Sequence, residues 1–302
     1  MAQWKINDVV TGLQQARHDW RDQQHRIKEY GGRELPSRKI LQEILHDLCG
    51  ILFPMRLGPE DLRQESENLY ISYTLEKVLN ILFNQIKLAL VYEARRHKTE
   101  LSLGEEQQAQ QIVQNFADAL PTIRRTLDAD VYAAFEGDPA AHSVDEVLLC
   151  YPGIYAIIHH RIAHHFYPEV PLLSRIISEL AHSATGIDIH PGAQIGAGFF
   201  IDHGTGVVIG ETCIIGQRVR IYQAVTLGAK RFEIDENGHL KKDYARHPIV
   251  EDDVVIYAGA TILGRITIGQ GSTIGGNVWL TQSVAAGSQV LQQNSELVPA
   301  KK

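Results

Sequence analysis

The sequence predicts an α+β protein in which an N-terminal all-helical domain is followed by a left-handed parallel β-helix. Three observations support this prediction. An aliphatic residue recurs every six positions in the C-terminal part, glycine is concentrated there, and the apolar period changes to that of an α-helix in the N-terminal part. Of the 25 glycines, 16 lie after residue 186, where tight corners need backbone conformations that glycine adopts without a Cβ clash.

Helices are predicted wherever apolar residues follow the helical period between glycine or proline breakers. They cover residues 4–28, 37–52, 68–97, 105–118, 121–135, 143–150, 153–166 and 171–184. Pro121 separates two of them, because proline removes a backbone donor and clashes with the preceding turn. The predicted divisions are a helical and oligomerisation domain over 1–185, a β-helix over 186–292 and a short tail over 293–302.

The six-residue repeat predicts short strands, three of which close one triangular coil. Its members are Val250, Ile256, Ile262, Ile268, Ile274 and Leu280, preceded by the runs Ile189, Ile195, Ile201, Val207 and Ile209, Ile215, Ile221, Leu227. The alternative is an antiparallel sandwich, which calls for alternation with period two and strands about eight to twelve residues apart. Neither pattern occurs. A β-helix with this short repeat is left-handed, in contrast to the usual right-handed crossover.

Composition excludes several classes of protein. A net charge of −7 and a pI near 6.0 argue against nucleic acid as a partner, which calls for a basic stripe. The three cysteines, Cys49, Cys150 and Cys213, are scattered, so neither a disulfide framework nor a cysteine metal site is predicted. The sequence contains neither an apolar run of membrane-spanning length nor the apolar core of a signal peptide. We therefore expect a soluble, cytoplasmic protein with no membrane partner.

The repeat is interrupted twice, and function in repeat proteins tends to lie at such interruptions. Residues 200–210, FIDHGTGVVIG, contain two extra residues that shift the phase and place Asp202 and His203 on the outer side. A 22-residue excursion follows the third run and ends in Arg246-His247. A connection of that length within a tight repeat is expected to cover a site.

A histidine beside a carboxylate is suited to general-base chemistry. The imidazole takes a hydroxyl proton while the carboxylate fixes its tautomer and stabilises the imidazolium. Asp188 precedes His203 by 15 residues, which is compatible with contact between neighbouring coils. The alternative is that His203 is an ordinary surface residue. His182 and His190 are interpreted as ordinary residues without a catalytic role.

The residues around His203 match a known family. Residues 187–228, IDIHPGAQIGAGFFIDHGTGVVIGETCIIGQRVRIYQAVTLG, closely resemble the serine O-acetyltransferases, hexapeptide-repeat acyltransferases that begin the biosynthesis of cysteine from serine. The similarity continues through RHPIVEDDVVIYAGATILGRITIGQGSTIGG and extends back to GDPAA and YPGIYAIIHHRIAHHF in the helical part. The element D-H-x-T-G-x-V-x-G-E with a downstream R-H-P is specific to this family among hexapeptide acyltransferases.

The resemblance implies roles for six residues. It assigns the general base to His203 and its paired carboxylate to Asp188, the substrate ammonium to Asp138 and Asp202, and the substrate carboxylate to Arg246 with His247 beside it. A zwitterionic amino acid in a cleft does need partners of both charges. The alternatives are a helix N-cap for Asp138 and a solvated surface position for Arg246.

The resemblance also implies the co-substrate and the assembly. Acetyl-CoA is expected in a groove between neighbouring solenoids of a homotrimer or a dimer of trimers, with backbone contacts at Gly228, Ala258 and Gly276, and no cofactor is expected to be tightly bound. L-Serine is the implied acceptor and L-cysteine an expected inhibitor. Family members that dock into cysteine synthase end in isoleucine, whereas this chain ends in Lys301-Lys302, so that complex is not predicted.

Other functions remain open at this point. The acceptor could be homoserine, phosphoserine or a sugar, although the pairing of Arg246 with Asp138 and Asp202 favours a free amino acid. A zinc hydratase like the γ-class carbonic anhydrases needs a third histidine, which the repeats do not place at suitable spacing beside His203 and His247. No metal site is therefore predicted. The last alternative is a scaffold that has lost its activity.

Overall fold

The structure is a computed structural model that describes residues 4–23, 35–97, 104–236 and 238–292. It contains two compact units, Met1–Leu35 and Pro36–Lys302. The first unit holds helix α1 (Ile6–Gln23), whose side chains are almost all exposed. The last part of the helix predicted over 4–28 lies outside the described residues, as does the predicted tail over 293–302.

The second unit begins with helices. They are α2 (Arg38–Leu52), α3 (Pro54–Leu57), the 3₁₀ turn η1 (Gln64–Ser66), α4 (Glu67–His97), α5 (Glu105–Gly137), α6 (Val144–Cys150), α7 (Pro152–Phe166) and α8 (Pro171–Thr185). The short elements α3 and η1 were not predicted. No helix in the described part of the chain combines the length and the apolar character needed to cross a bilayer.

The break predicted at Pro121 is wrong. Helix α5 runs through this proline as a single element from Glu105 to Gly137. Its buried stripe continues across the proline, since Phe116, Leu120 and Ile123 are all buried. An interior proline costs about 3 kcal/mol, whereas each large apolar side chain gains about 1.5–3 kcal/mol on burial. Burial of the stripe therefore outweighs the loss.

The β-helix begins at Asp188, three residues after the end of α8, and contains three parallel sheets. Sheet A is β1 (Asp188–Ile189), β4 (Val208–Ile209), β7 (Thr226–Gly228), β10 (Thr261–Leu263) and β13 (Trp279–Leu280). Sheet B is β2 (Gln194–Ile195), β5 (Ile214–Ile215), β8 (Ile249–Val250) and β11 (Thr267–Ile268). Sheet C is β3 (Phe200–Ile201), β6 (Arg220–Ile221), β9 (Val255–Ile256), β12 (Thr273–Ile274) and β14 (Gln289–Val290). The predicted fold class is confirmed.

The chain visits the sheets in the order A, B, C, so each coil has three corners, which we call the A–B, B–C and C–A corners. The repeated aliphatic residues form the inward ladders, for example Ile189, Ile209 and Leu227 in sheet A. Most ladder steps are six residues, but the step from Ile201 in β3 to Ile209 in β4 is eight. The two extra residues predicted there lie at the first C–A corner.

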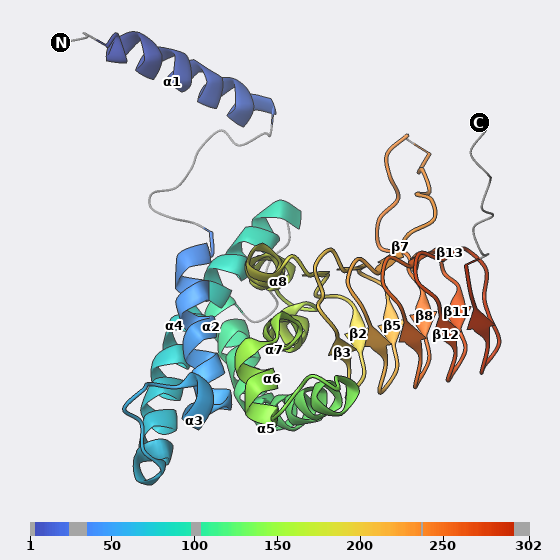
Figure 1. Ribbon diagram of the computed structural model, residues 1–302. Coiled ribbons are helices and arrows are strands. Elements are labelled where there is room, and N and C mark those ends of the chain that lie inside the picture. Colours follow the sequence, from blue (N-terminus) through green and yellow to red (C-terminus); the bar gives the residue numbers. More distant parts are fainter. Residues whose placement is uncertain (1–3, 24–34, 98–103, 237, 293–302) are drawn as a thin grey trace. The chain divides into compact units, whose positions relative to one another are not determined.

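The helices pack against the first coil of the β-helix (Figure 1). Helices α5 and α7 contact β3, and α8 contacts β1. Asp130 of α5 is fully buried and pairs with Arg161 of α7, with Nε to Oδ2 at 2.6 Å. Arg161 also donates to the carbonyls of Ile195 and Gly196, and Asp130 accepts from the backbone N–H of Phe199. Because of this docking the helices and the solenoid form one compact unit.

Candidate functional site

His203 lies at the interrupted C–A corner, two residues after the end of β3. Its backbone φ is 59°, a left-handed conformation in which histidine is several-fold enriched among non-glycine residues. The next residue, Gly204, has φ 92°, and a Cβ there would lie 2.4 Å from Ile187 Cδ1. Only glycine fits this turn, and the turn presents His203 outward with 70% of its side chain exposed.

His203 belongs to a group of five residues that are linked to one another by hydrogen bonds, ion pairs or charge interactions. We call this group the His203 cluster: Asp138, Tyr151, Asp202, His203 and Arg220. His203 Nδ1 lies 3.7 Å from Asp202 Oδ1. The other oxygen of Asp202 accepts from Arg220 Nη2 at 3.0 Å. Asp138, the C-cap of α5, accepts from the Tyr151 hydroxyl at 2.5 Å. The cluster therefore brings together three predicted site residues with two that were not predicted.

The contacts within the cluster favour the ionised form of Asp138. The hydrogen bond from Tyr151, followed by that from the backbone N–H of Ala140, lowers the pKa of Asp138. The same bond raises the pKa of Tyr151 to about 12, because the hydroxyl is held by a carboxylate. Asp138 stands at a helix C-terminus, so the predicted N-cap alternative does not apply to it. A carboxylate of this kind can receive an ammonium group.

A second group of residues, which includes the predicted Arg246 and His247, lies at the A–B corner, where the excursion between β7 and β8 returns (Figure 1). We call it the Arg246 cluster: Tyr167, Glu211, Thr212, Arg246 and His247. Arg246 Nη2 donates to Glu211 Oε2 at 2.5 Å, and the Tyr167 hydroxyl donates to Glu211 Oε1 at 2.5 Å. The backbone N–H groups of Arg246 and His247 both donate to Thr212 Oγ1. The end of the excursion is thereby fixed to the solenoid.

The ring of His247 is buried against the solenoid, and a Cβ on Gly210 would lie 2.0 Å from it. Its Nδ1 accepts from the backbone N–H of Thr212 at 3.1 Å. Burial, with the charge of Arg246 as a smaller cause, lowers the pKa of His247 to about 4. The imidazole is therefore neutral at physiological pH and carries its proton on Nε2, which leaves one donor for a ligand.

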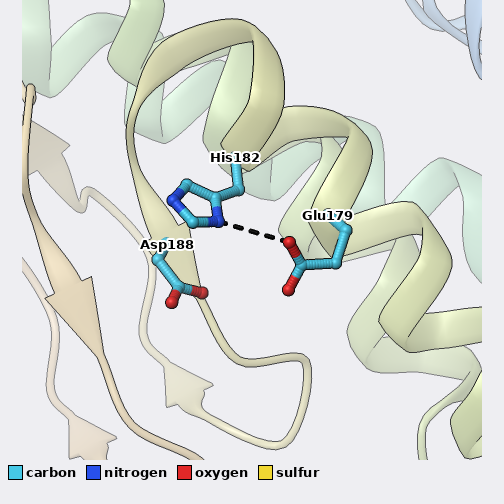
Figure 2. Close-up of side chains that lie close together, drawn as sticks. All are labelled: Glu179, His182 and Asp188. Atoms are coloured by element: carbon cyan, nitrogen blue, oxygen red, sulfur yellow. Dashed lines mark hydrogen bonds and ion pairs between the residues drawn. The ribbon is translucent and has the colours of Figure 1, made fainter.

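Asp188 lies on the outer side of β1, apart from His203. Among the described residues no hydrogen bond or ion pair joins the two. Instead, Asp188 lies near Glu179 and His182 of α8 (Figure 2), with one ligand atom from each residue within 4.8 Å of the others. Glu179 accepts from His182 at 3.3 Å and from Arg175. The types of residue suit a divalent cation, but the Glu179 carboxylate already has a cation partner in Arg175.

The residues predicted to contact CoA divide between two corners. Ala258 and Gly276 lie in successive coils at the C–A corner, the one that carries His203, and the Ala258 carbonyl accepts from the N–H of Asn277 at 2.9 Å. Gly228 is the last residue of β7 and lies at the other end of the strands of sheet A, at the A–B corner. A Cβ on Gly228 would lie 2.9 Å from Leu263 Cδ2.

Five residues of the two clusters were missed by sequence reasoning: Tyr151, Tyr167, Glu211, Thr212 and Arg220. Tyr151 and Tyr167 flank helix α7, and only the fold brings them to the corners of the solenoid. Glu211 and Arg220 stand at outward positions of the repeat, where a charged residue carries no signal of its own. Their roles come from tertiary contacts.

Comparison with known proteins identifies two family models in the chain. The model described as "Serine acetyltransferase, N-terminal" matches residues 64–158, and "Bacterial transferase hexapeptide (six repeats)" matches residues 247–282. A protein of Synechococcus elongatus named "Serine acetyltransferase, plasmid" is 56% identical over 294 residues, which cover 96% of this chain and 91% of that protein.

Solved structures give the same result. Serine acetyltransferase isoform 3 of Entamoeba histolytica, in complex with cysteine, matches with a TM-score of 0.71 and 35% identity, covering 91% of this chain and 87% of that one. Soybean serine acetyltransferase complexed with serine matches with a TM-score of 0.54 and 29% identity, covering 87% of this chain and all of that one. The cysteine and the serine are ligands of those two proteins.

Proposed function

The chain belongs to the serine acetyltransferase family, and from that premise we propose that it transfers the acetyl group of acetyl-CoA to the hydroxyl of L-serine. One observation carries the assignment of the site. A largely exposed imidazole stands beside two carboxylates at the one corner where the six-residue ladder step becomes eight. The product is O-acetylserine, an intermediate of cysteine biosynthesis.

The proposed mechanism is direct transfer with His203 as general base. The imidazole removes the proton from the serine hydroxyl as the oxygen attacks the thioester carbonyl. Backbone N–H groups stabilise the tetrahedral oxyanion. The C–S bond then breaks, and the CoA thiolate takes its proton from the imidazolium. No cysteine is needed as a nucleophile, and Cys213 is fully buried with a pKa raised to about 12 by that burial.

The amino-acid substrate is held at both of its charged ends. We assign its ammonium to Asp138 and Asp202, the two carboxyl side chains of the His203 cluster. We assign its carboxylate to Arg246, which is already oriented by Glu211, with the Nε2–H of His247 as a second donor. An acceptor without these charges, such as a neutral sugar, would leave the two clusters unpaired, and unpaired polar groups in a closed site are costly.

The two clusters point to a site shared between copies of the chain. They occupy the C–A and A–B corners, which lie at opposite ends of the strands of sheet A. Within the described residues no hydrogen bond or ion pair joins the two clusters. Head-to-tail contact would place the His203 cluster of one copy against the Arg246 cluster of the next, and such heterologous contacts close into a ring. We therefore propose a homotrimer, in which Asp188 orients His203 of the neighbouring copy.

The remaining assignments follow from this arrangement. We propose that acetyl-CoA lies along the groove between copies, with backbone contacts at Ala258 and Gly276 from one copy and at Gly228 from the next. L-Cysteine is expected to compete for the serine site, because it differs only in the thiol. Residues 1–185 are assigned as the helical domain and 186–292 as the acyltransferase domain.

The function is tested by measuring release of CoA thiol with acetyl-CoA and a panel of acceptors. L-Serine is expected to support turnover, and L-homoserine, phosphoserine and N-acetylglucosamine are expected to fall well below it. Turnover with a sugar alone would contradict the amino-acid site. Stoichiometric zinc in the purified protein, with loss of turnover on chelation, would favour the hydratase alternative.

A further inference from the structure

Arg220 lies at the centre of the His203 cluster. Its Nη2 donates to Asp202 at 3.0 Å, and its guanidinium carbon lies 5.1 Å from the ring centre of Phe200 and 4.8 Å from that of Tyr222. Only 26% of its side chain is exposed. Contacts with two aromatic rings restrict the position of the guanidinium, and in that position it bonds to one oxygen of Asp202.

The scaffold does not require a cation at this position. Arg220 faces outward from β6, and its ladder neighbours in sheet C are Phe200 and Val255. The next outward residues of the ladder, Thr273 and Gln289, are also uncharged. Arg220 is thus a single charge in an otherwise uncharged row. Since the pairing of β6 with β3 and β9 is made by backbone groups, we look for the role of this side chain in the His203 cluster.

Arg220 also influences Asp138. A Cβ on Gly137 would lie 3.6 Å from Arg220 Nη1, so the guanidinium packs beside the C-terminal end of α5, where a positive charge is favourable. The charge of Arg220 contributes to the lowered pKa of Asp138, after the hydrogen bonds from Tyr151 and Ala140. Two carboxylates therefore share one resident cation, which leaves one negative charge for the substrate ammonium.

The balance between the two carboxylates and the charge of Arg220 affects catalysis because His203 lies in the same cluster. The titratable or charged groups that interact with it are Asp138 and Asp202. Behind these lie Tyr151 on Asp138, and Arg220 with Tyr222 on Asp202. Without Arg220 the cluster would hold two carboxylates and no cation. A proton on His203 would then relieve the excess negative charge, and a protonated imidazole cannot act as the base.

We propose that Arg220 is a positioning residue that neutralises Asp202 and thereby keeps His203 free of its proton, so that transfer continues at a lower pH than it otherwise would. The catalytic part of this inference rests on the proposed function. The electrostatic part does not, because it concerns only the proton on His203.

The test compares three variants by the pH dependence of kcat/KM for L-serine and by chemical modification. Arg220→Gln removes the charge and Arg220→Lys keeps it. Arg218→Gln is the matched control, because Arg218 lies two residues earlier on the same coil and forms an exposed pair with Asp253. Diethyl pyrocarbonate acylates only unprotonated imidazole, so the pH profile of His203 modification, read by peptide mass spectrometry, reports the proton without turnover.

Arg220→Gln is expected to move the acid limb of both profiles upward by about one pH unit, the size of effect that a single neighbouring charge has on a partly exposed group. On that limb kcat/KM should fall about tenfold, with recovery to within about threefold at higher pH. Arg220→Lys should stay within about 0.3 pH unit of the wild type, and Arg218→Gln should not shift.

If Arg220→Gln still melts cooperatively and the acid limbs of its kcat/KM and modification profiles stay at the wild-type pH, the inference is wrong. If Arg220→Gln does not fold, an Arg220→Lys profile displaced as far as one pH unit would overturn it instead. A shifted modification profile in a chain that does not acetylate L-serine would support the charge role of Arg220 and contradict the proposed function.

Discussion

The B–C and C–A corners of the β-helix are built from the same repeat but differ in what they carry. At the B–C corner the first coil is fixed to the helices by the buried Asp130–Arg161 pair, and a later coil carries an exposed pair between Arg218 and Asp253. At the C–A corner the first coil has two extra residues, and these present His203 to solvent.

This difference separates stability from chemistry within one fold. At the B–C corner the polar side chains form bonds with one another and with the backbone. The interrupted corner leaves an imidazole and an ionised carboxylate at the surface, where they gain little for folding. Substitutions at the two corners should therefore affect different measurements.

The largest effect is expected from His203→Ala, at the interrupted corner. Loss of a general base lowers kcat by about a hundredfold to ten-thousandfold, while the free energy of unfolding should hardly change because the side chain is exposed. Steady-state kinetics and urea unfolding measure the two quantities. His239→Ala is the control, since that histidine is also exposed and lies on the excursion. A near-normal rate in His203→Ala would refute the mechanism.

The reverse pattern is expected at the regular corner. Asp130→Asn leaves Arg161 as a buried charge without its counter-ion and should lower the free energy of unfolding by about 3–5 kcal/mol, while kcat of the folded fraction remains unchanged. Asp253→Asn breaks only an exposed pair and should cost less than about 1 kcal/mol. Equal losses in the two variants would show that burial does not distinguish these pairs.

Helix α7 should make the stability of the fold pH-dependent. Burial lowers the pKa of His159 to about 4, and burial lowers that of His160 as well. The unfolded chain, with an ordinary histidine pKa of about 6.5, binds protons before the native state does. Stability is therefore complete above about pH 6.5 and falls as the pH drops towards 4, by about 3 kcal/mol for His159.

Urea midpoints at pH 7.5 and pH 5 measure this effect. His159→Gln should flatten the dependence, whereas His239→Gln at an exposed position should leave it as it is. A flat profile in the wild type would contradict the buried, neutral state of the α7 histidines.

A smaller effect is expected from Gly210→Ala. The new Cβ would overlap the ring of His247 and displace the end of the excursion that holds Arg246. KM for L-serine should rise about tenfold, since a misplacement of about 1 Å in a binding group has effects of this order or larger, while KM for acetyl-CoA stays constant. A parallel rise in both constants would indicate a general distortion instead.

Much of this architecture was predictable from the sequence, because a solenoid depends mainly on local periodicity. The inward aliphatic ladder, the glycine corners and the phase break at His203 are all visible as changes of spacing. The break expected at Pro121 was wrong, because the penalty of proline is local whereas the burial that offsets it depends on the whole stripe of α5.

The composition of the site was less predictable than its location. Periodicity locates an interrupted corner but does not tell which side chains from α5 or α7 reach it. Arg220 and Glu211 occupy ordinary outward positions, and only the fold brings them against Asp202 and Arg246. The expected approach of Asp188 to His203 is likewise not seen within one chain, since β1 turns that carboxylate towards α8.

The most direct test of a site shared between copies is complementation. His203→Ala and Arg246→Gln chains are each expected to be nearly inactive, one for lack of the base and the other for lack of the carboxylate partner. When the two are unfolded, mixed in equal amounts and refolded, random trimers should regain about a quarter of the wild-type activity, because that share of interfaces pairs an intact His203 with an intact Arg246. If the refolded mixture is no more active than its separate components, while refolded wild type is active, the proposed shared site is wrong.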